Sequence, residues 1–269
     1  MFNITRNGLD AIGKELGVIS NNIANANTNA FKRSRSEFVD FYSKALSSNP
    51  KSKTGLGTML QGTQKIMKQG SPILTGSSLD LTISGKGFFI LSPKEGADPR
   101  FTRDGSFSLD ADGNLVTTEG FNVAGYLRDE DGNINNSAAV PLKVPLTIED
   151  DGKVLLLTKL DVNNQGMIET TYGLNTILQR GQVALAKFNN EIQLKSTGAN
   201  TYQANEKSGE QILGTAMTSN FGEILSGSLE SSNTNISLEM INLIKTQQAF
   251  NGNARILQSN VEVTRRLMG

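Results

Sequence analysis

The sequence contains no cysteine, no histidine and no tryptophan among its 269 residues. Without cysteine the chain can form no disulfide and offers no thiolate for zinc or for nucleophilic attack. Without histidine it also lacks the commonest general base and metal ligand of enzymes. Composition leaves Ser–Lys and paired-carboxylate catalysis open, but no serine or carboxylate stands in a recognisable catalytic setting. We therefore expect a protein that is not an enzyme and that needs no cofactor or metal ion.

An excess of charge of one sign is also missing, because the 26 Lys and Arg residues are balanced by 26 Asp and Glu residues. A neutral chain has no electrostatic reason to bind nucleic acid or an anionic membrane. No apolar run approaches the roughly 18 residues of a membrane-spanning helix, and the first residues show no charged region followed by an apolar one. We expect no nucleic-acid partner, no lipid insertion and no cleaved signal peptide.

The first part of the chain, residues 1–46, begins with a pattern typical of an amphipathic helix. Apolar residues follow one another there in alternating steps of three and four. They are Leu9, Ile12, Leu16, Ile19 and Ile23. Glycines at positions 8, 13 and 17 interrupt the pattern, and each weakens a helix by roughly 0.5–1 kcal/mol relative to alanine. The helix should therefore need partners to be stable.

This predicted helix ends in an unusual stretch, SNNIANANTNAFKR at positions 20–33, which holds five asparagines within nine residues. Asparagine is a poor residue inside a helix because its side chain competes for backbone hydrogen bonds. Two roles remain open. The asparagines cap the helix and turn the chain, or their amides are buried between helices and fix the register of the contact.

The last part of the chain, residues 229–269, predicts a second and longer helix. Apolar residues recur there in two adjacent rows with seven-residue spacing. They are Ile236, Leu243, Phe250 and Leu257 in one row, and Met240 and Val261 in the other. At 1.5 Å per residue this helix would be about 50 Å long, more than the diameter of a small domain. We expect these residues and those of the first helix to form a seam that is buried on assembly.

The middle of the chain predicts an extended connector over residues 47–69 and a β region over residues 70–228. In LDLTI (79–83) apolar residues alternate with Asp80 and Thr82, which predicts that these two face outward. Four Asp-Gly pairs, at positions 104, 112, 131 and 151, predict hairpin turns. Residues 140–180 are where a small outer portion of the β region would lie. The fold class predicted is α+β, with long N- and C-terminal helices that pack as a coiled-coil-like pair, and with a central, mainly antiparallel β domain.

Two acidic stretches, DADGN (110–114) and DEDGN (129–133), are superficially like calcium-binding loops. An EF-hand loop needs glycine at its sixth position and glutamate at its twelfth. Glycine here stands at the fourth position, and Phe121 and Val140 stand at the twelfth. Turns are the better interpretation, and we predict no metal site.

The stretch NNIANANTNAFK (21–32) closely resembles the N-terminal signature of the bacterial flagellar rod and hook proteins. The matching residues that we take as signature and turn positions are Asn21, Asn22, Asn25, Thr28, Phe31 and Lys32. Position 30 is alanine where the family usually has glycine. Similar stretches follow in the order of the family: LDLTISGKGFF (79–89), FTRDGSFSLDADGNLVTTEGFNVAGY (101–126) and GSLESSNTNISLEMINLIKTQQAF (227–250).

The resemblance implies a structural subunit that assembles into the helical axial tube of the flagellum, transmits torque and lines the export channel. Its implied partners are copies of itself, neighbouring rod or hook subunits, and cap and export-apparatus proteins. It would leave the cell through the flagellar type III export apparatus without a cleaved signal. The length resembles a rod protein, whereas KTGLGTMLQGTQKIMKQGS (53–71) and GYLRDEDGN (125–133) look hook-like.

Two alternatives of other classes remain. One is a secreted binding or adhesive module whose β domain is oligomerised through the terminal helices. The other is a β-domain hydrolase that works without histidine.

Overall fold

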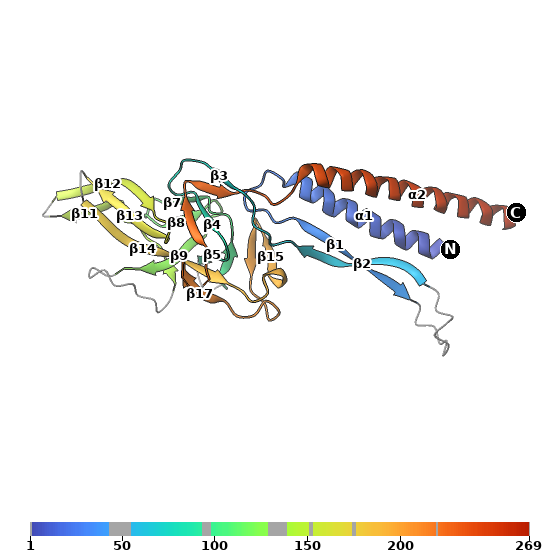
Figure 1. Cartoon of the computed structure of the whole chain (residues 1–269), viewed down its shortest axis with the longest axis horizontal. Coiled ribbons are helices and arrows are strands. Elements are labelled where there is room, and N and C mark those ends of the chain that lie inside the picture. Colours follow the sequence, from blue (N-terminus) through green and yellow to red (C-terminus); the bar gives the residue numbers. More distant parts are fainter. Residues whose placement is uncertain are drawn as a thin grey trace. The chain divides into compact units, whose positions relative to one another are not determined.

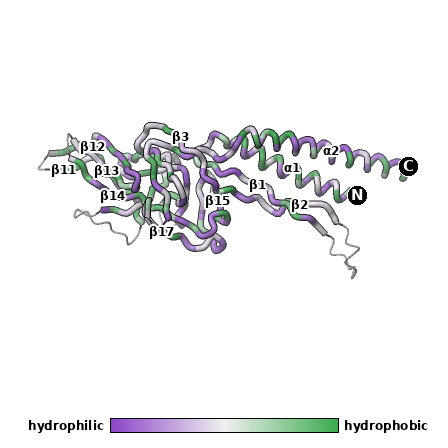
Figure 2. Tube along the Cα trace, viewed as in Figure 1, coloured by the Kyte–Doolittle hydropathy of each residue, from purple (hydrophilic) through white to green (hydrophobic). Residues whose placement is uncertain are grey.

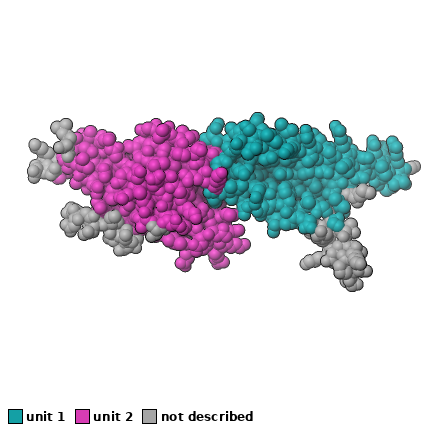
Figure 3. All heavy atoms as spheres, viewed as in Figure 1, with its two compact units in different colours: residues 1–27, 31–67, 233–269 teal, residues 28–30, 68–232 magenta. Residues whose placement is uncertain are grey.

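The computed structural model describes residues 2–42, 55–92, 98–128, 139–150, 153–173, 176–218 and 220–268. The chain divides into two compact units (Figures 1 and 3). Unit 1 comprises residues 1–27, 31–67 and 233–269, and unit 2 comprises Thr28–Ala30 and Lys68–Ser232. The expected α+β class is confirmed, since two terminal helices accompany a central antiparallel sheet.

Unit 1 contains both helices and one hairpin. Helix α1 spans Phe2–Ala24 and helix α2 spans Ile236–Met268. Strands β1 (Ser34–Tyr42) and β2 (Gly55–Lys65) pair antiparallel, with Ser34 opposite Lys65 at the base of the hairpin. Helix α1 packs against α2 and against β2. The first and last segments of the chain therefore form one structural unit.

The hairpin differs from the interpretation of the sequence, which extended the N-terminal part to residue 46 and treated residues 47–69 as a connector. Residues 34–42 and 55–65 pair with each other, and the ladder contains two irregularities in register. These irregularities break the two-residue alternation by which a half-buried strand is recognised in a sequence. The expectation for residues 43–54 falls outside the described part of the chain.

Unit 2 is built from short strands that pair antiparallel throughout. A path of nine strands runs in the order β11-β12-β13-β14-β9-β5-β6-β16-β15, with β7, β8, β10 and β17 attached to it. Two further pairs, β4 with β18 and β3 with β19, lie beside it. The strands are β3 (Pro72–Leu74), β4 (Leu81–Ser84), β5 (Phe88–Ser92), β6 (Arg100–Thr102), β7 (Phe107–Leu109), β8 (Leu115–Thr117), β9 (Asn122–Leu127), β10 (Val140–Pro141), β11 (Thr147–Asp150), β12 (Lys153–Val162), β13 (Met167–Tyr172), β14 (Thr176–Lys187), β15 (Lys195–Gly198), β16 (Thr201–Gln203), β17 (Ile212–Thr215), β18 (Glu223–Ser226) and β19 (Ser228–Glu230).

Residues 140–180, which the sequence suggested as a small outer portion, lie in β10 to β13 and the first part of β14. Strand β14 continues to Lys187 and pairs with β13 at one end and with β9, β5 and β17 at the other. This segment is therefore continuous with the rest of the sheet. It is not separated from unit 2 as a compact unit of its own.

Strand β5 lies at the centre of unit 2 and is buried on both faces. Phe89 and Leu91 belong to a core of aliphatic residues that includes Leu81, Ile83 and Val123. On the other face, Phe88 makes edge-to-face contacts with Phe188 and Tyr202 at centroid distances of 6.1 and 6.0 Å. Such contacts add to the burial of apolar area, so unit 2 carries a complete core of its own.

The prediction that Thr82 lies on the outer face of its strand was wrong. Thr82 is fully buried, and its hydroxyl donates a 2.9 Å hydrogen bond to the carbonyl oxygen of Ser228. Because β4 is covered on both faces, the alternation of apolar and polar residues along it does not indicate which side chains are exposed. A buried polar group needs a hydrogen-bond partner, and the hydroxyl of Thr82 finds one in β19, a strand far along the chain.

The Asp112-Gly113 pair forms the predicted hairpin turn between β7 and β8. The amide of Gly113 donates to the carbonyl oxygen of Asp110 at 2.9 Å, and Gly113 has a φ of +78°. The Asp104-Gly105 pair does not close a hairpin, since β6 pairs with β5 and β16 rather than β7. Gly105 instead lies against the backbone of Leu81. The pairs at 131 and 151 lie outside the described residues.

Two glycines with positive φ offer a matched test of this turn. A Cβ atom on Gly113 would lie 2.1 Å from the carbonyl oxygen of Val144, whereas one on Gly120, with a φ of +82°, would meet nothing within 4 Å. We predict that Gly120→Ala lowers the free energy of unfolding by about 1 kcal/mol, the strain alone. Gly113→Ala should cost about 3 kcal/mol or more, because the backbone must also move. Denaturant titration of unit 2 measures both, and equal losses would contradict the steric argument.

Candidate functional site

The asparagine-rich stretch ends helix α1 and turns the chain into strand β1. Both the backbone amide and the side-chain Nδ2 of Asn25 donate to the carbonyl oxygen of Asn21, at 3.1 and 3.0 Å. Ala30, at the end of the turn, is fully buried and has a φ of +55°. The left-handed conformation for which the family's glycine is suited is therefore adopted by alanine here. Asn25 thus has the capping role that the sequence left open.

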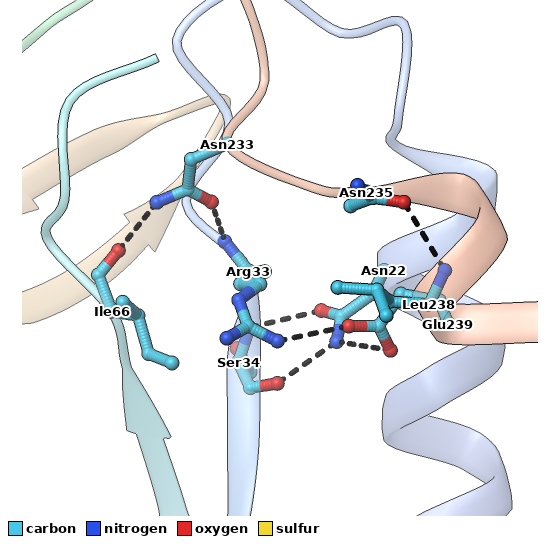
Figure 4. Close-up of polar contacts among 8 residues, drawn as sticks. All are labelled: Asn22, Arg33, Ser34, Ile66, Asn233, Asn235, Leu238 and Glu239. Atoms are coloured by element: carbon cyan, nitrogen blue, oxygen red, sulfur yellow. Dashed lines mark hydrogen bonds and ion pairs between the residues drawn. The ribbon is translucent and has the colours of Figure 1, made fainter. Parts of the chain in front are cut away.

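Asn22 has a different role, because its side chain is buried and joins three elements (Figure 4). Its Oδ1 accepts a 2.9 Å hydrogen bond from the amide of Ser34, and its Nδ2 donates at 2.8 Å to the carbonyl oxygen of the same residue. The same nitrogen donates to Oε2 of Glu239 at 3.3 Å. One amide therefore links α1, the first residue of β1 and the first turns of α2.

Glu239 is the buried charge of this junction, with 3% of its surface exposed. Its Oε1 lies 3.1 Å from Nη1 of Arg33, whose side chain is 37% exposed. A buried carboxylate is tolerated only when it is paired and hydrogen-bonded, and Arg33 and Asn22 meet both needs. The exposed side of Arg33 leaves the ion pair open to solvent at one edge.

Two further asparagines complete the junction (Figure 4). Asn233 accepts a 2.8 Å hydrogen bond from the amide of Arg33 and donates at 2.7 Å to the carbonyl oxygen of Ile66, after β2. Asn235 caps α2, since its Oδ1 accepts a 3.1 Å bond from the amide of Leu238. We call Asn22, Arg33, Ser34, Asn233, Asn235 and Glu239 the junction cluster.

The other signature residues differ in how far they are buried. Phe31 is buried, and the ammonium of Lys65 lies 5.2 Å from its ring centroid. Burial lowers the pKa of Lys65. Lys32 is buried, Thr28 is half-buried and Asn21 is exposed. The signature therefore combines buried junction residues with turn residues.

Helices α1 and α2 run antiparallel (Figure 1), and their facing residues include a polar row. Asn22 bonds to Glu239 at one point, and at another a Cβ atom on Gly8 would lie 3.7 Å from Nδ2 of Asn253. These points are two heptads apart on both helices. Midway on α1 lies Glu15, and burial raises the pKa of its carboxyl group. Midway on α2 lies Thr246, which is buried.

The apolar residues of α2 are mostly exposed. Of its described residues only Glu239 and Thr246 are buried, and Figure 2 shows hydrophobic and hydrophilic residues alternating along its length. The large apolar side chains exposed by 37–82% are Ile236, Leu238, Met240, Ile241, Ile244, Phe250, Ile256, Val261, Val263, Leu267 and Met268. Exposed apolar patches of this extent mark interaction surfaces.

The expected seam residues fall into two groups. Ile19 is buried, and Leu9, Ile12, Leu16, Ile23, Leu243 and Leu257 are half-buried. Ile236, Met240, Phe250 and Val261 are exposed. Ile241, Ile244, Ile256 and Val263 were missed because a seven-residue repeat selects only one stripe. Glu239 was also missed, although its seven-residue spacing from Thr246, Asn253 and Asn260 was a visible signal.

Comparison with known proteins identifies the family to which this architecture belongs. Residues 2–32 match the flagella basal body rod protein family, and residues 225–268 match the flagellar basal body rod FlgEFG protein C-terminal family. Residues 82–170 match the flagellar hook protein FlgE/F/G D1 domain. The flagellar basal-body rod protein FlgG of Buchnera aphidicola subsp. Schizaphis graminum is 32% identical over 98% of this chain and 96% of its own length. The chain belongs to the flagellar rod and hook protein family.

Two more relatives place the chain within this family. The FlgG protein of Agrobacterium fabrum is 30% identical over 97% of this chain and 95% of its own length. The flagellar hook protein FlgE of Helicobacter pylori strain 26695 is 35% identical over 71% of this chain but only 25% of its own length. The family assignment makes the chain a structural subunit of the bacterial flagellum and not an enzyme. It implies that the chain polymerises with itself and contacts neighbouring flagellar subunits.

Neither described helix is long and apolar enough to cross a membrane. The described residues also contain no group of three or more Asp or Glu side chains that could hold a metal ion.

The junction cluster yields a prediction for Asn22. Replacing it by alanine leaves the amide and carbonyl of Ser34 and one oxygen of Glu239 without their partner, at a cost of about 2–3 kcal/mol. Asn21→Ala removes an exposed amide from the adjacent position and should change stability by less than about 0.5 kcal/mol. Denaturant titration followed by helical circular dichroism compares the two, and equal effects would mean that the buried bonds contribute nothing.

Proposed function

We propose that this chain is a rod-type axial subunit that assembles through α1 and α2 into a helical tube. The observation that carries the proposal is the exposed apolar surface of α2, which the rest of unit 1 does not cover. A helix with apolar residues over much of its circumference is normally buried. In a polymer, neighbouring copies would provide that burial.

The free energy available is sufficient for assembly. Burying the exposed half of a large apolar side chain contributes on the order of 1 kcal/mol, and α2 exposes about ten of them. Because the contact is between different surfaces of identical copies, it is heterologous and generates an open helix when the rotation does not close. The seam residues Leu9, Ile12, Leu16, Ile23, Leu243 and Leu257 would then pack both within a subunit and between subunits.

Length favours the rod over the hook. The chain covers 95–96% of the rod relatives described above and 25% of the hook relative. The alignment thus spans nearly the whole of each rod relative and a quarter of the hook relative. One observation points toward the hook: the FlgE protein of Helicobacter mustelae is 44% identical over 134 residues. We propose a rod subunit with hook-like segments, whose small outer portion lies within residues 140–180.

The proposal includes the route and partners of the subunit. It is exported without a cleaved signal through the type III apparatus, and it assembles with the help of cap proteins. In the tube the terminal helices line the export channel, and the whole subunit transmits torque. Support comes from the family assignment and from the apolar helices, which need a surrounding polymer.

Ile244 on α2 provides a test of assembly, since its side chain is 55% exposed in the single chain. We predict that Ile244→Asp abolishes polymerisation, because a buried unpaired carboxylate costs several kcal/mol at each interface. Ile244→Leu keeps an apolar side chain of the same size at this position and should leave polymerisation intact. Electron microscopy and sedimentation of the purified chain compare the two variants. Tubes formed by Ile244→Asp would contradict the proposal that this surface of α2 is buried between subunits.

Basal bodies from a strain that lacks this chain test the subtype. A rod subunit predicts particles whose rod is truncated and which carry no hook. A hook subunit predicts a complete rod with growth stopped at its outer end. Electron micrographs distinguish the two, and a complete rod would exclude the proposed rod assignment. Deleting residues 1–26 or 240–269 should reproduce the defect while unit 2 remains folded.

A further inference from the structure

The chain passes between its two units at three places: around Thr28–Ala30, between residues 67 and 68, and between residues 232 and 233. These connecting segments are the covalent links between the helices of unit 1 and the sheet of unit 2. One residue at the end of β19 contacts or belongs to all three segments.

That residue is Glu230. Its backbone carbonyl oxygen accepts a 2.8 Å hydrogen bond from the amide of Ala30, in the first segment. Its side-chain Oε1 accepts a 2.8 Å hydrogen bond from the amide of Gly70, in the second segment. Glu230 itself lies at the start of the third segment, two residues before the chain leaves unit 2.

The other carboxylate oxygen of Glu230 is held from inside unit 2. Oε2 lies 3.6 Å from Nη1 of Arg103, and the two side chains are 0% and 5% exposed. The guanidinium of Arg103 lies 5.0 Å from the ring centroid of Phe88, in the aromatic cluster around β5. Burial lowers the pKa of Arg103, which the charge of Glu230 opposes. Burial, aided by that same charge, raises the pKa of the Tyr202 hydroxyl.

The second and third segments also touch each other directly, and the first is held by another residue of unit 2. A Cβ atom on Gly70 would lie 2.0 Å from the carbonyl oxygen of Ser231, so only glycine fits at this approach. The amide of Ser231 donates at 2.9 Å to the carbonyl oxygen of Ser71. In the first segment, the carbonyl oxygen of Asn29 accepts a 2.7 Å hydrogen bond from Nδ2 of Asn200.

We propose that Glu230 is a positioning residue, which ties the three connecting segments to one buried point of unit 2 through Arg103. Force that enters any one segment is then shared with the other two and with the aromatic cluster. The tie is a property of the single chain. Its mechanical use, the passage of torque from the helices to the sheet, rests on the proposed function.

The tie predicts a specific change in amide exchange of the full-length monomer. In Glu230→Leu/Arg103→Met the ion pair becomes an apolar pair of similar size, which preserves the stability of unit 2. The amide of Gly70 loses its acceptor, so peptides covering residues 68–72 should exchange at least about tenfold faster. Peptides covering residues 28–32 should change less, because Ala30 donates to the backbone carbonyl of Glu230, which the variant keeps. Peptides of β5 should be unchanged. Unchanged exchange in the segments, or an equal rise throughout unit 2, would overturn the proposal.

A conservative variant separates the tie from a general loss of the ion pair. Glu230→Gln/Arg103→Met also lacks both charges but keeps an oxygen at the position that accepts from Gly70. We expect it to restore slow exchange at residues 68–72, and the same fast exchange in both double variants would overturn the role of the acceptor. Asp161→Asn, which breaks the exposed Lys159–Asp161 pair, is the control and should change nothing in these segments.

The mechanical part is tested in cells that carry the same variants. Cells with Glu230→Leu/Arg103→Met should lose swimming speed in a viscous medium relative to Asp161→Asn, although both assemble flagella. Equal speeds would overturn the mechanical role without touching the exchange result. Failure of the unmodified chain to restore flagella in a deletion strain would instead overturn the proposed function.

Discussion

The carboxylate of Glu239 is the constraint around which unit 1 is arranged. A charge with 3% exposure is stable only if opposite charge and hydrogen-bond donors reach it. Those donors come from Arg33, just before β1, and from Asn22, on the last turns of α1. Helix α1, strand β1 and helix α2 must therefore meet in one arrangement for the charge to be satisfied, and the two ends of the chain are brought together as a consequence.

The two units solve the problem of apolar burial differently. Unit 2 encloses its aliphatic core and the aromatic cluster of β5 within its own strands. Unit 1 instead buries polar groups well and apolar groups poorly, since α2 buries only Glu239 and Thr246. Specificity within the subunit is thus supplied by polar contacts, while most of the apolar surface of α2 remains available to other copies. This division suits a subunit that polymerises with copies of itself.

The sequence predicted what depends on local pattern. The three-four spacing from Leu9 to Ile23 and the seven-residue spacing from Ile236 to Leu257 lie within α1 and α2, and Asp112-Gly113 is a hairpin turn. It did not predict what depends on distant partners. Thr82 is buried, and its hydroxyl donates a hydrogen bond to the carbonyl oxygen of Ser228, far along the chain. The bonds of Asn22 to Ser34 and Glu239 could not be derived from spacing, since a buried asparagine and a capping asparagine look alike in sequence.

The antiparallel contact of α1 and α2 also bears on how such chains vary in length. Asn22 with Glu239 and Gly8 with Asn253 are separated by the same number of residues on each helix. Inserting one residue between them in either helix would rotate everything beyond it by about 100° and turn the polar row away from its partner. Insertions within the paired helices should therefore be tolerated only as whole heptads, with an insertion of the same length in the other helix. Insertions in the sheet region are accommodated more readily, because they do not change which residues of α1 and α2 face each other.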